Sequence, residues 1–390
     1  MPSTGHCLRA ARSCRASVEL APGSGKVNGP RRLLVGALVV LLILLIVKAL
    51  LGTVLIAPRF AVDMEIPLRA AERWLAGQPP YLASAFSSPP GATQPFLYPP
   101  FVLPLFALLT GLPRLVVGTI AVAVMLAASV AAGRRLGVPW VWLPLVLAWP
   151  PFAEAIFGAN LQTVLFAAFV FLFYRAGSTA WAPRWRDLRD PAESGPLVGS
   201  LATVVGAIKI SQPHPWVYVL RQRPRAAIGG ALVVMALVAA TILLTGTTLW
   251  FDWIAQLRLA GDPTWDLGGF AIPRFVPPGV GLVVAGLCVI AVWFVPRERA
   301  GAWVGLLSVV GALSLHIFGL LFLVPAMLVI RREAALMAAL FIATYSYEGA
   351  WAGILICAVG LAVVERSARM GPLGTASERR YTGGSPSSAA

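Results

Sequence analysis

Long apolar stretches recur along this chain, and they constrain its fold more than any other feature. The first covers residues 33–57, and segments of comparable hydrophobicity continue to residue 364. About 20 apolar residues are enough for a helix to cross the hydrocarbon core of a bilayer. The composition agrees, since 58% of the residues are hydrophobic and only 12% are charged, against about 25% charged in soluble domains. The sequence therefore predicts an all-α, polytopic integral membrane protein.

We expect about 10–12 transmembrane helices. Several apolar segments are too short for a full crossing, which predicts half-helices or tight hairpins, with breaks near residues 210–213 and 314–316. Such breaks are tolerated only where protein or a watery cavity covers the backbone. The expected crossings lie near residues 33–57, 114–133, 139–157, 161–174, 195–210, 212–220, 226–246, 279–296, 301–316, 318–330, 334–346 and 350–364.

The net charge of +15 indicates which loops lie on the cytoplasmic side of the membrane, and it does not indicate nucleic-acid binding. The arginines form short clusters between alternate apolar segments and at both ends of the chain, as cytoplasmic loops do. We therefore expect both termini in the cytoplasm and no nucleic-acid partner. Residues 1–30 and 367–390 are expected to be disordered cytoplasmic tails around a membrane domain at 31–366.

Several kinds of chemistry have no visible motif. The four cysteines, Cys7, Cys14, Cys288 and Cys357, show no CxxC spacing, so a metal site or disulfide framework is not expected. A Walker loop, HExxH and a tight carboxylate cluster are also absent from the sequence. We expect no metal and no cofactor.

Two longer polar segments fall on the outer side in this topology, at residues 58–113 and 247–278. A short apolar stretch, 101–112, is too brief to span and is expected to lie in the interface. The second segment contains Trp250, Trp253 and Trp265, and tryptophan is favoured at the headgroup level. Long ordered loops are commonly functional, so the active groups are sought here.

Asp63 follows the first crossing by a few residues and is the main acid candidate. A carboxylate there could remove a proton from a sugar hydroxyl, although a solvated loop acid is the simpler reading. The same ambiguity applies to Glu65. Lys209 ends an apolar segment and His214 follows its break; a cation there could meet a lipid phosphate or could only snorkel.

Other polar candidates lie at further outer turns. His316 could donate a hydrogen bond to a leaving phosphate, and Arg274 could clamp phosphate oxygens. Asn160 and Gln162 could bind sugar hydroxyls. A structural histidine in a turn and amides that cap helices are the alternatives.

Three motifs in the first outer segment carry a family resemblance. They are the run Asp63-Met64-Glu65-Ile66-Pro67-Leu68-Arg69-Ala70-Ala71, the turn Gly77-Gln78-Pro79-Pro80-Tyr81, and Phe96-Leu97-Tyr98-Pro99-Pro100-Phe101. In order and spacing they resemble glycosyltransferase family 87. Weaker echoes follow at 158–162, 209–213 and 314–316, with Pro67 standing where the family usually has an aromatic residue.

The resemblance implies a GT-C fold and a polyprenol-phosphate-mannose-dependent mannosyltransferase. By that analogy Asp63 is the general base of an inverting transfer, and Lys209, His316, His214 and Arg274 bind the donor phosphate. Glu65, Tyr81, Tyr98, Asn160 and Gln162 would bind the acceptor or the sugar. The expected partners are membrane lipids, the lipid-linked sugar and a glycolipid or glycan acceptor.

Two other classes of function share part of this pattern. A secondary transporter also has about twelve crossings and broken helices, but its polar residues lie near the midplane, whereas here they collect at one face. A non-catalytic scaffold in envelope assembly is the third reading. The excess of arginine over lysine suggests a GC-rich bacterial genome and hence a bacterial plasma membrane.

Overall fold

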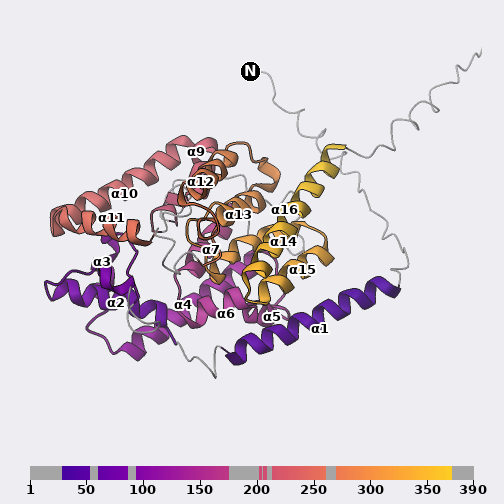
Figure 1. The fold of residues 1–390 in the computed structure, drawn as a ribbon, viewed down its shortest axis with the longest axis horizontal. Coiled ribbons are helices and arrows are strands. Elements are labelled where there is room, and N and C mark those ends of the chain that lie inside the picture. The colour runs from indigo at the N-terminus through magenta and orange to yellow at the C-terminus, as the bar shows by residue number, and fades with distance from the viewer. Residues whose placement is uncertain are drawn as a thin grey trace, which may run out of the picture.

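The computed structural model describes residues 29–52, 60–86, 94–174, 202–203, 205–208, 213–260 and 269–370. Lys209 and most of both predicted tails lie outside these residues. Within them the chain forms helices and a single isolated bridge between Gly269 and Leu315. This confirms the all-α, polytopic membrane fold that the sequence predicts (Figure 1).

The described residues form a series of helices of very different lengths. In chain order they are α1 (Gly29–Leu51), α2 (Val62–Leu75), η2 (Ala83–Phe86), η3 (Pro100–Val102), α3 (Leu103–Ala107), α4 (Arg114–Arg135), α5 (Leu143–Ala148), α6 (Pro150–Phe157), α7 (Gln162–Phe173), α9 (His214–Gln222), α10 (Pro224–Thr245), α11 (Thr248–Ala260), η6 (Ile272–Arg274), α12 (Pro278–Val292), η7 (Arg297–Arg299), α13 (Ala300–Val310), η8 (Ile317–Leu323), α14 (Val324–Val329), α15 (Arg332–Ala343) and α16 (Tyr347–Met370).

Among the described residues, four helices are individually long and apolar enough to cross a membrane. They are α1, α4, α10 and α16. The pair α12 and α13 passes the same test together but bends by 119° between its halves, and α7 and the segment Ile317–Val329 are shorter apolar helices. Large apolar side chains are exposed along the long helices, such as Leu243 at 87%, as expected for helices that face lipid.

Prolines explain where several of the helices end. The expected crossing at 139–157 is split into α5 and α6, because Pro150 and Pro151 lack the amide hydrogens that would continue α5. Trp149 between them is extended, at φ −62° and ψ 134°, as the residue before a proline prefers. Pro224 ends α9 in the same way and begins α10. The expected break at 314–316 is present between α13 and η8.

Helix ends gather at two opposite faces of the molecule. At one, which we call the arginine face, basic side chains join segments that are distant in sequence. Its contacts are Arg31 with Glu333 at 2.6 Å, Arg135 with the Tyr174 carbonyl at 2.5 Å, Arg221 with the Val295 carbonyl at 2.9 Å, and Arg299 with Glu365. All of these arginines belong to clusters that the sequence places on one side of the membrane.

The other face, which we call the site face, joins the two outer segments. The Trp253 indole donates to the Leu97 carbonyl at 3.0 Å, and the Gln256 amide donates to the Leu82 carbonyl at 3.1 Å. Both donors lie on α11, a helix within a segment that the sequence analysis treats as a loop. Figure 1 shows α2, α3 and α11 together at the left of the view, away from the C-terminal end of α16.

Two hydrophobic cores lie under these faces. The larger core includes Phe166, Phe169 and Phe322, whose rings pack edge to face. The smaller core lies under the site face and includes Met64, Phe96 and Trp253. Ile156 on α6 packs against both, so α6 connects the two halves of the molecule.

Candidate functional site

Asp63 is held against the C-terminal end of α6 by the backbone and by its side chain. The Ala61 amide donates to the Phe157 carbonyl and the Asp63 amide donates to the Gly158 carbonyl, both at 2.9 Å. The Asn160 side-chain amide donates to Asp63 Oδ2 at 2.7 Å. Asp63 also lies in the first turn of α2, where the helix dipole favours a carboxylate. The carboxylate is therefore fixed in place and half-buried.

The orientation of the Asn160 amide follows from its second contact. Asn160 Oδ1 accepts a hydrogen bond from the Gln162 backbone amide at 2.9 Å. With its oxygen engaged there, the amide nitrogen points at Asp63. Both Asn160 and Gln162 are buried, and the structure joins them to Asp63 as one polar group.

Gly158 lets Asp63 approach α6 closely. A Cβ atom at position 158 would lie 3.1 Å from Asp63 Oδ2, so the carboxylate occupies space that most residues would fill. Glu154 stands one turn earlier, and its carbonyl accepts the Gly158 amide at 2.8 Å. Side chains four apart share one face of a helix, which places Glu154 about one turn from the Asp63 carboxylate.

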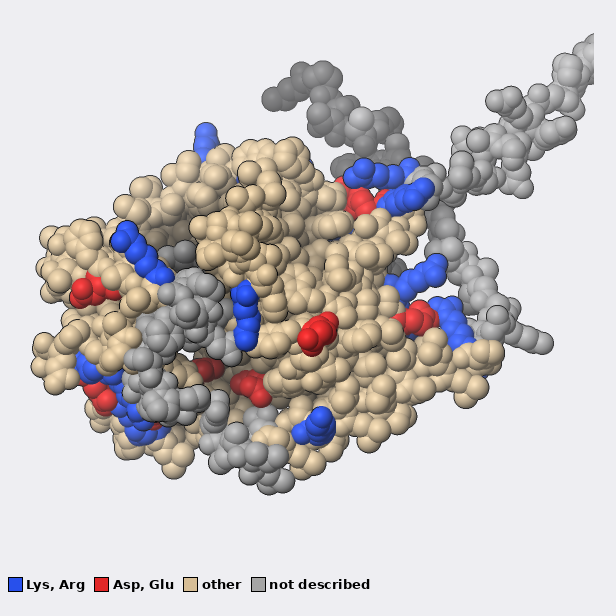
Figure 2. All heavy atoms as spheres, in the orientation of Figure 1, with Lys and Arg blue, Asp and Glu red and all other residues tan. Residues whose placement is uncertain are grey.

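Glu154 belongs to this candidate site by position, and the sequence analysis did not single it out. The Tyr345 hydroxyl donates a hydrogen bond to the Glu154 carboxylate. Partial burial, together with this carboxylate, raises the pKa of Tyr345, so the hydroxyl stays protonated. The position of Glu154 inside the expected crossing 139–157 could have identified it from the sequence. Acids within a membrane are costly and are usually functional. Figure 2 shows acidic side chains in a hollow of this region, with basic side chains nearby.

Strained backbone surrounds these side chains. Among the described residues, three that are not glycine adopt a left-handed conformation: Ala61 (φ 53°), Ala159 (φ 56°) and Tyr345 (φ 61°). Ala61 precedes Asp63, Ala159 precedes Asn160, and Tyr345 contacts Glu154. Such conformations cost about 1–3 kcal/mol each and cluster at functional sites. The strained residues therefore lie next to the polar side chains of the candidate site.

Of the two tyrosines of the first outer segment, Tyr98 lies near Asp63, whereas the carboxylate near Tyr81 is Asp252. The Tyr81 hydroxyl donates to the Tyr98 carbonyl at 2.8 Å, and the buried Phe96 ring contacts both tyrosine rings. Burial, with a smaller effect of the nearby Asp63 carboxylate, raises the pKa of Tyr98. Tyr98 thus keeps its proton and can donate a hydrogen bond next to the acid.

Arg274 and His316 both lie next to Gly269, and we call this pair the cationic group after its arginine. The Phe270 amide donates to the Leu315 carbonyl at 2.6 Å, and a Cβ on Gly269 would lie 3.1 Å from His316 Nδ1. Arg274 Nη1 donates to the Gly269 carbonyl at 3.4 Å. Both side chains are half-buried, so each keeps a surface from which it can reach a ligand.

A short turn connects the acidic and the cationic groups. Tyr345 contacts Glu154, while the Arg274 guanidinium lies 4.3 Å from the centre of the Tyr347 ring. The two tyrosines are two residues apart, which limits the distance between their Cα atoms to roughly 7 Å. The turn that carries both tyrosines thus has the acidic residues on one side and the cationic group on the other. Such an arrangement is suited to moving a proton on one side and holding an anion on the other.

Residues 96–272 match the model of glycosyltransferase family 87. The match confirms the resemblance that the sequence predicts and indicates a membrane glycosyltransferase. No curated protein and no solved structure matches the chain.

The family 87 segment contains part of the site. Tyr98, Glu154, Asn160 and Gln162 lie within it, and it ends two residues before Arg274. Asp63 and Tyr81 precede the segment and His316 follows it. The tertiary structure brings these outlying residues to the matched part.

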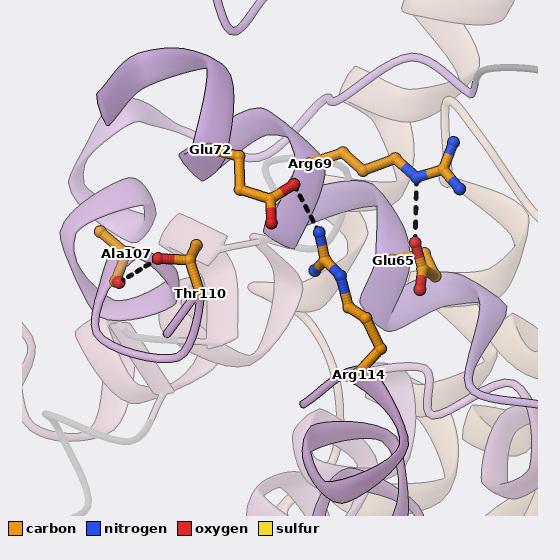
Figure 3. A network of polar contacts seen from close by, with 6 residues as sticks. All are labelled: Glu65, Arg69, Glu72, Ala107, Thr110 and Arg114. Atoms are coloured by element: carbon orange, nitrogen blue, oxygen red, sulfur yellow. Dashed lines mark hydrogen bonds and ion pairs between the residues drawn. The ribbon is translucent and has the colours of Figure 1, made fainter. Parts of the chain in front are cut away.

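Two of the predicted residues lie away from this polar group. Glu65 forms an ion pair with Arg69 at 2.9 Å on the exposed side of α2, beside the pair of Glu72 with Arg114 (Figure 3). His214 is fully buried at the start of α9, where a Cβ on Gly311 would lie 2.8 Å from its Nε2. A phosphate could reach His214 only if α9 and α13 separated there.

Lys209 lies outside the described residues, and its predicted role stays a prediction. Within the residues that are described, there is no cluster of three or more His, Cys, Asp or Glu side chains able to hold a metal ion. The expectation of metal-free chemistry likewise stays a prediction.

Proposed function

We propose that this membrane glycosyltransferase moves a hexose, with mannose as the first candidate, from a polyprenyl-phosphate donor to a lipid or glycan acceptor. The observation that carries the proposal is the Asp63 carboxylate held by Asn160 at 2.7 Å, next to a family 87 segment. A base fixed at a helix end near the protonated Tyr98 suits proton abstraction from a sugar hydroxyl.

The proposed reaction is a single displacement. The acceptor hydroxyl oxygen attacks the anomeric carbon while Asp63 takes its proton. The bond from that carbon to the phosphate oxygen breaks, and the electron pair leaves with the polyprenyl phosphate. Attack from the side opposite the leaving group inverts the anomeric configuration, through an oxocarbenium-like transition state.

Cations on the far side of the turn stabilise the leaving group in this scheme. Arg274 presents a guanidinium that can hold two phosphate oxygens, and its contacts with Gly269 and Tyr347 restrict its motion. His316 can donate a second hydrogen bond. Preorganised donors of this kind need no reorganisation during the reaction, and Lys209 is proposed to join them.

Glu154 and Tyr345 complete the proposed site from the α6 side. The Glu154 carboxylate accepts hydrogen bonds and lies about one turn from Asp63, so it can orient hydroxyls of the sugar that Asp63 activates. Asn160, Tyr81 and Tyr98 line the same region in the proposal. Glu65, paired with Arg69, would contact the acceptor only from the rim.

The site face is proposed to be extracytoplasmic, in a bacterial plasma membrane. The arginine face holds basic clusters from both ends of the chain and from the connections between helices, which is the pattern of cytoplasmic loops. The site would then meet lipid-linked sugars, since nucleotide sugars are confined to the cytoplasm.

The test is a transfer assay with two donors. Membranes that contain the protein are incubated with an acceptor lipid extract and either labelled polyprenyl-phosphate mannose or labelled GDP-mannose. We expect label in the lipid product only from the lipid-linked donor, and none with Asp63→Ala membranes. Equal labelling by the Asp63→Ala protein, or transfer from the nucleotide sugar alone, would refute the proposal.

A further inference from the structure

A cavity of about 410 Å³ lies between α13 and the C-terminal part of α16, far from the site face. It is lined by Trp303, Ala362, Glu365, Arg366 and Arg369. Tyr347, which borders the candidate site, begins the same 24-residue helix, so the cavity is about 25–30 Å from that site along the helix axis. It has no part in the proposed transfer.

Positive side chains outnumber negative ones at this cavity. Glu365 is engaged by Arg299, whose side chain is only 9% exposed, and its other oxygen lies 3.6 Å from Arg369 Nε. Three arginines, Arg299, Arg366 and Arg369, thus surround one glutamate. One positive charge neutralises Glu365, and an excess of two is left at the cavity mouth. The cavity is therefore suited to an anion.

Trp303 offers a hydrogen-bond donor in the same place. Its Nε1 atom is buried and has no hydrogen-bond partner among the described residues. An indole N–H can only donate, and leaving such a group unpaired costs free energy. Because the atom is closed to solvent, an oxygen acceptor in the cavity beside Trp303 could reach it only after the indole turns toward the cavity.

The surroundings of the cavity are apolar on the side toward the middle of α16. Leu355, Val359 and Val363 are 59%, 62% and 53% exposed, and they lie on the same helix before the arginines. A ligand with an anionic head and apolar chains could contact both regions. Tryptophan and arginine at the end of a spanning helix are also the residues that meet lipid headgroups.

We propose that this cavity binds the phosphate of an anionic phospholipid from the leaflet at the arginine face. Arg366 and Arg369 would pair with the phosphate, the Trp303 indole would donate to it, and the acyl chains would follow α16. The Arg299–Glu365 pair would hold α13 and α16 at the right separation.

Native mass spectrometry of the purified full chain in detergent tests the proposal. The protein is mixed with equal amounts of phosphatidylglycerol and phosphatidylcholine, and the bound lipid is counted. The variants are Arg366→Gln/Arg369→Gln and, as a matched control, Arg331→Gln/Arg332→Gln, which removes two exposed arginines of the same face. Each arginine near a lipid phosphate is worth about fivefold in affinity.

We expect wild type and control to retain phosphatidylglycerol in preference to phosphatidylcholine, and the Arg366/Arg369 variant to bind it at least tenfold more weakly. Trp303→Phe, which keeps an aromatic side chain, although a smaller one, and removes the N–H, should weaken binding several-fold without unfolding. An equal loss of phosphatidylglycerol binding in the Arg331/Arg332 control, or no preference for the anionic lipid, would overturn the proposal.

A competition arm separates a lipid from a free phosphate. Millimolar inorganic phosphate is added to the wild-type complex before measurement. Retention of phosphatidylglycerol supports a lipid site. Its complete displacement would show that the phosphate group alone is recognised and would overturn the assignment to a lipid.

Discussion

Asp63 depends on the absence of a side chain at position 158. Its Oδ2 atom is 3.1 Å from where a Cβ on Gly158 would stand, and the Asn160 amide donates a hydrogen bond to the same oxygen. A group pinned between two neighbours can be moved by a small change to either one. Two predictions at the scale of single residues follow from this geometry.

The Gly158→Ala variant should lose activity while keeping its fold. Gly158 has ordinary helical backbone angles, φ −72° and ψ −9°, so alanine adds no backbone strain there. The added methyl group would push the Asp63 carboxylate by a few tenths of an ångström, and small misplacements of a reacting group are costly. We expect kcat to fall roughly tenfold with an unchanged melting temperature. Gly36→Ala, which meets no atom within 4 Å, is the control, and equal kcat in both variants would contradict this.

The Glu154→Gln variant should weaken the proposed contact with the sugar. Glutamine preserves shape but removes the charge, and hydrogen bonds to charged groups are worth about 1.5–3 kcal/mol. We expect kcat/KM for the lipid-linked donor and acceptor to fall about 10- to 100-fold. Steady-state kinetics against Glu348→Gln, an exposed acid one turn away from Tyr345, checks the effect. A normal kcat/KM would remove Glu154 from the site.

Sequence reasoning found some of these residues and missed others for physical reasons. Asp63 and Asn160 stood out because each follows a membrane segment on the same predicted side, and they prove to be hydrogen-bonded. Glu154 was hidden within an apolar run that reads as continuous. Tyr345 carries no signal in the sequence, since its role depends on a left-handed turn that only the tertiary structure shows.

At the scale of elements, close helix contacts depend on glycine. A Cβ on Gly305 in α13 would lie 2.2 Å from the Phe322 carbonyl oxygen of η8. The segment η8 follows His316 directly and packs against α6. The position of the cationic group is therefore set by how closely α13 and η8 approach.

The Gly305→Ala variant should destabilise the protein. The clashing atom belongs to the backbone and cannot rotate away, and overpacking of this kind typically costs about 1–3 kcal/mol. We expect a lower midpoint in thermal unfolding followed by size-exclusion chromatography in detergent. Gly229→Ala in α10, with nothing within 4 Å, should unfold at or above the wild-type midpoint. If both variants melted alike, the predicted close approach of α13 and η8 would be wrong.

The elements themselves were partly predictable. Apolar length located α4 and α10 within a few residues, because a lipid-facing helix must be continuously apolar. Hydropathy does not identify helices that lie on the site face, because they contain polar residues. One of them, α11, contains Trp250, Asp252 and Arg258 and was expected to be a loop. The division of α5 from α6 follows from two prolines that the hydropathy pattern overlooks.

At the scale of the whole molecule, charge separates the two faces. The contacts of the arginine face join only segments that the sequence places in the cytoplasm, while the contacts of the site face join the outer ones. Hydropathy and charge thus predicted the grouping of the loops. They could not give the distances within each group, because those depend on helix packing.

The orientation of the two faces can be read by cysteine labelling. In a background with Cys7 and Cys14 replaced by serine, Gln78→Cys reports the site face and Ser367→Cys the arginine face; both positions are exposed. A membrane-impermeant maleimide should label residue 78 in intact cells, and residue 367 only after permeabilisation. The reverse pattern would place the site in the cytoplasm.

The central claim is that the carboxylate of Asp63 takes the acceptor proton. The most direct test is kcat of purified, reconstituted Asp63→Asn with a lipid-linked sugar donor, measured beside Glu72→Gln. Glu72 lies on the same helix but pairs with Arg114 at the exposed side (Figure 3), so it undergoes the same chemical change away from the site. A general base contributes about 10²- to 10⁴-fold, and we predict a loss of that size for Asp63→Asn and a near-normal kcat for Glu72→Gln. An Asp63→Asn enzyme that kept its kcat would contradict the account.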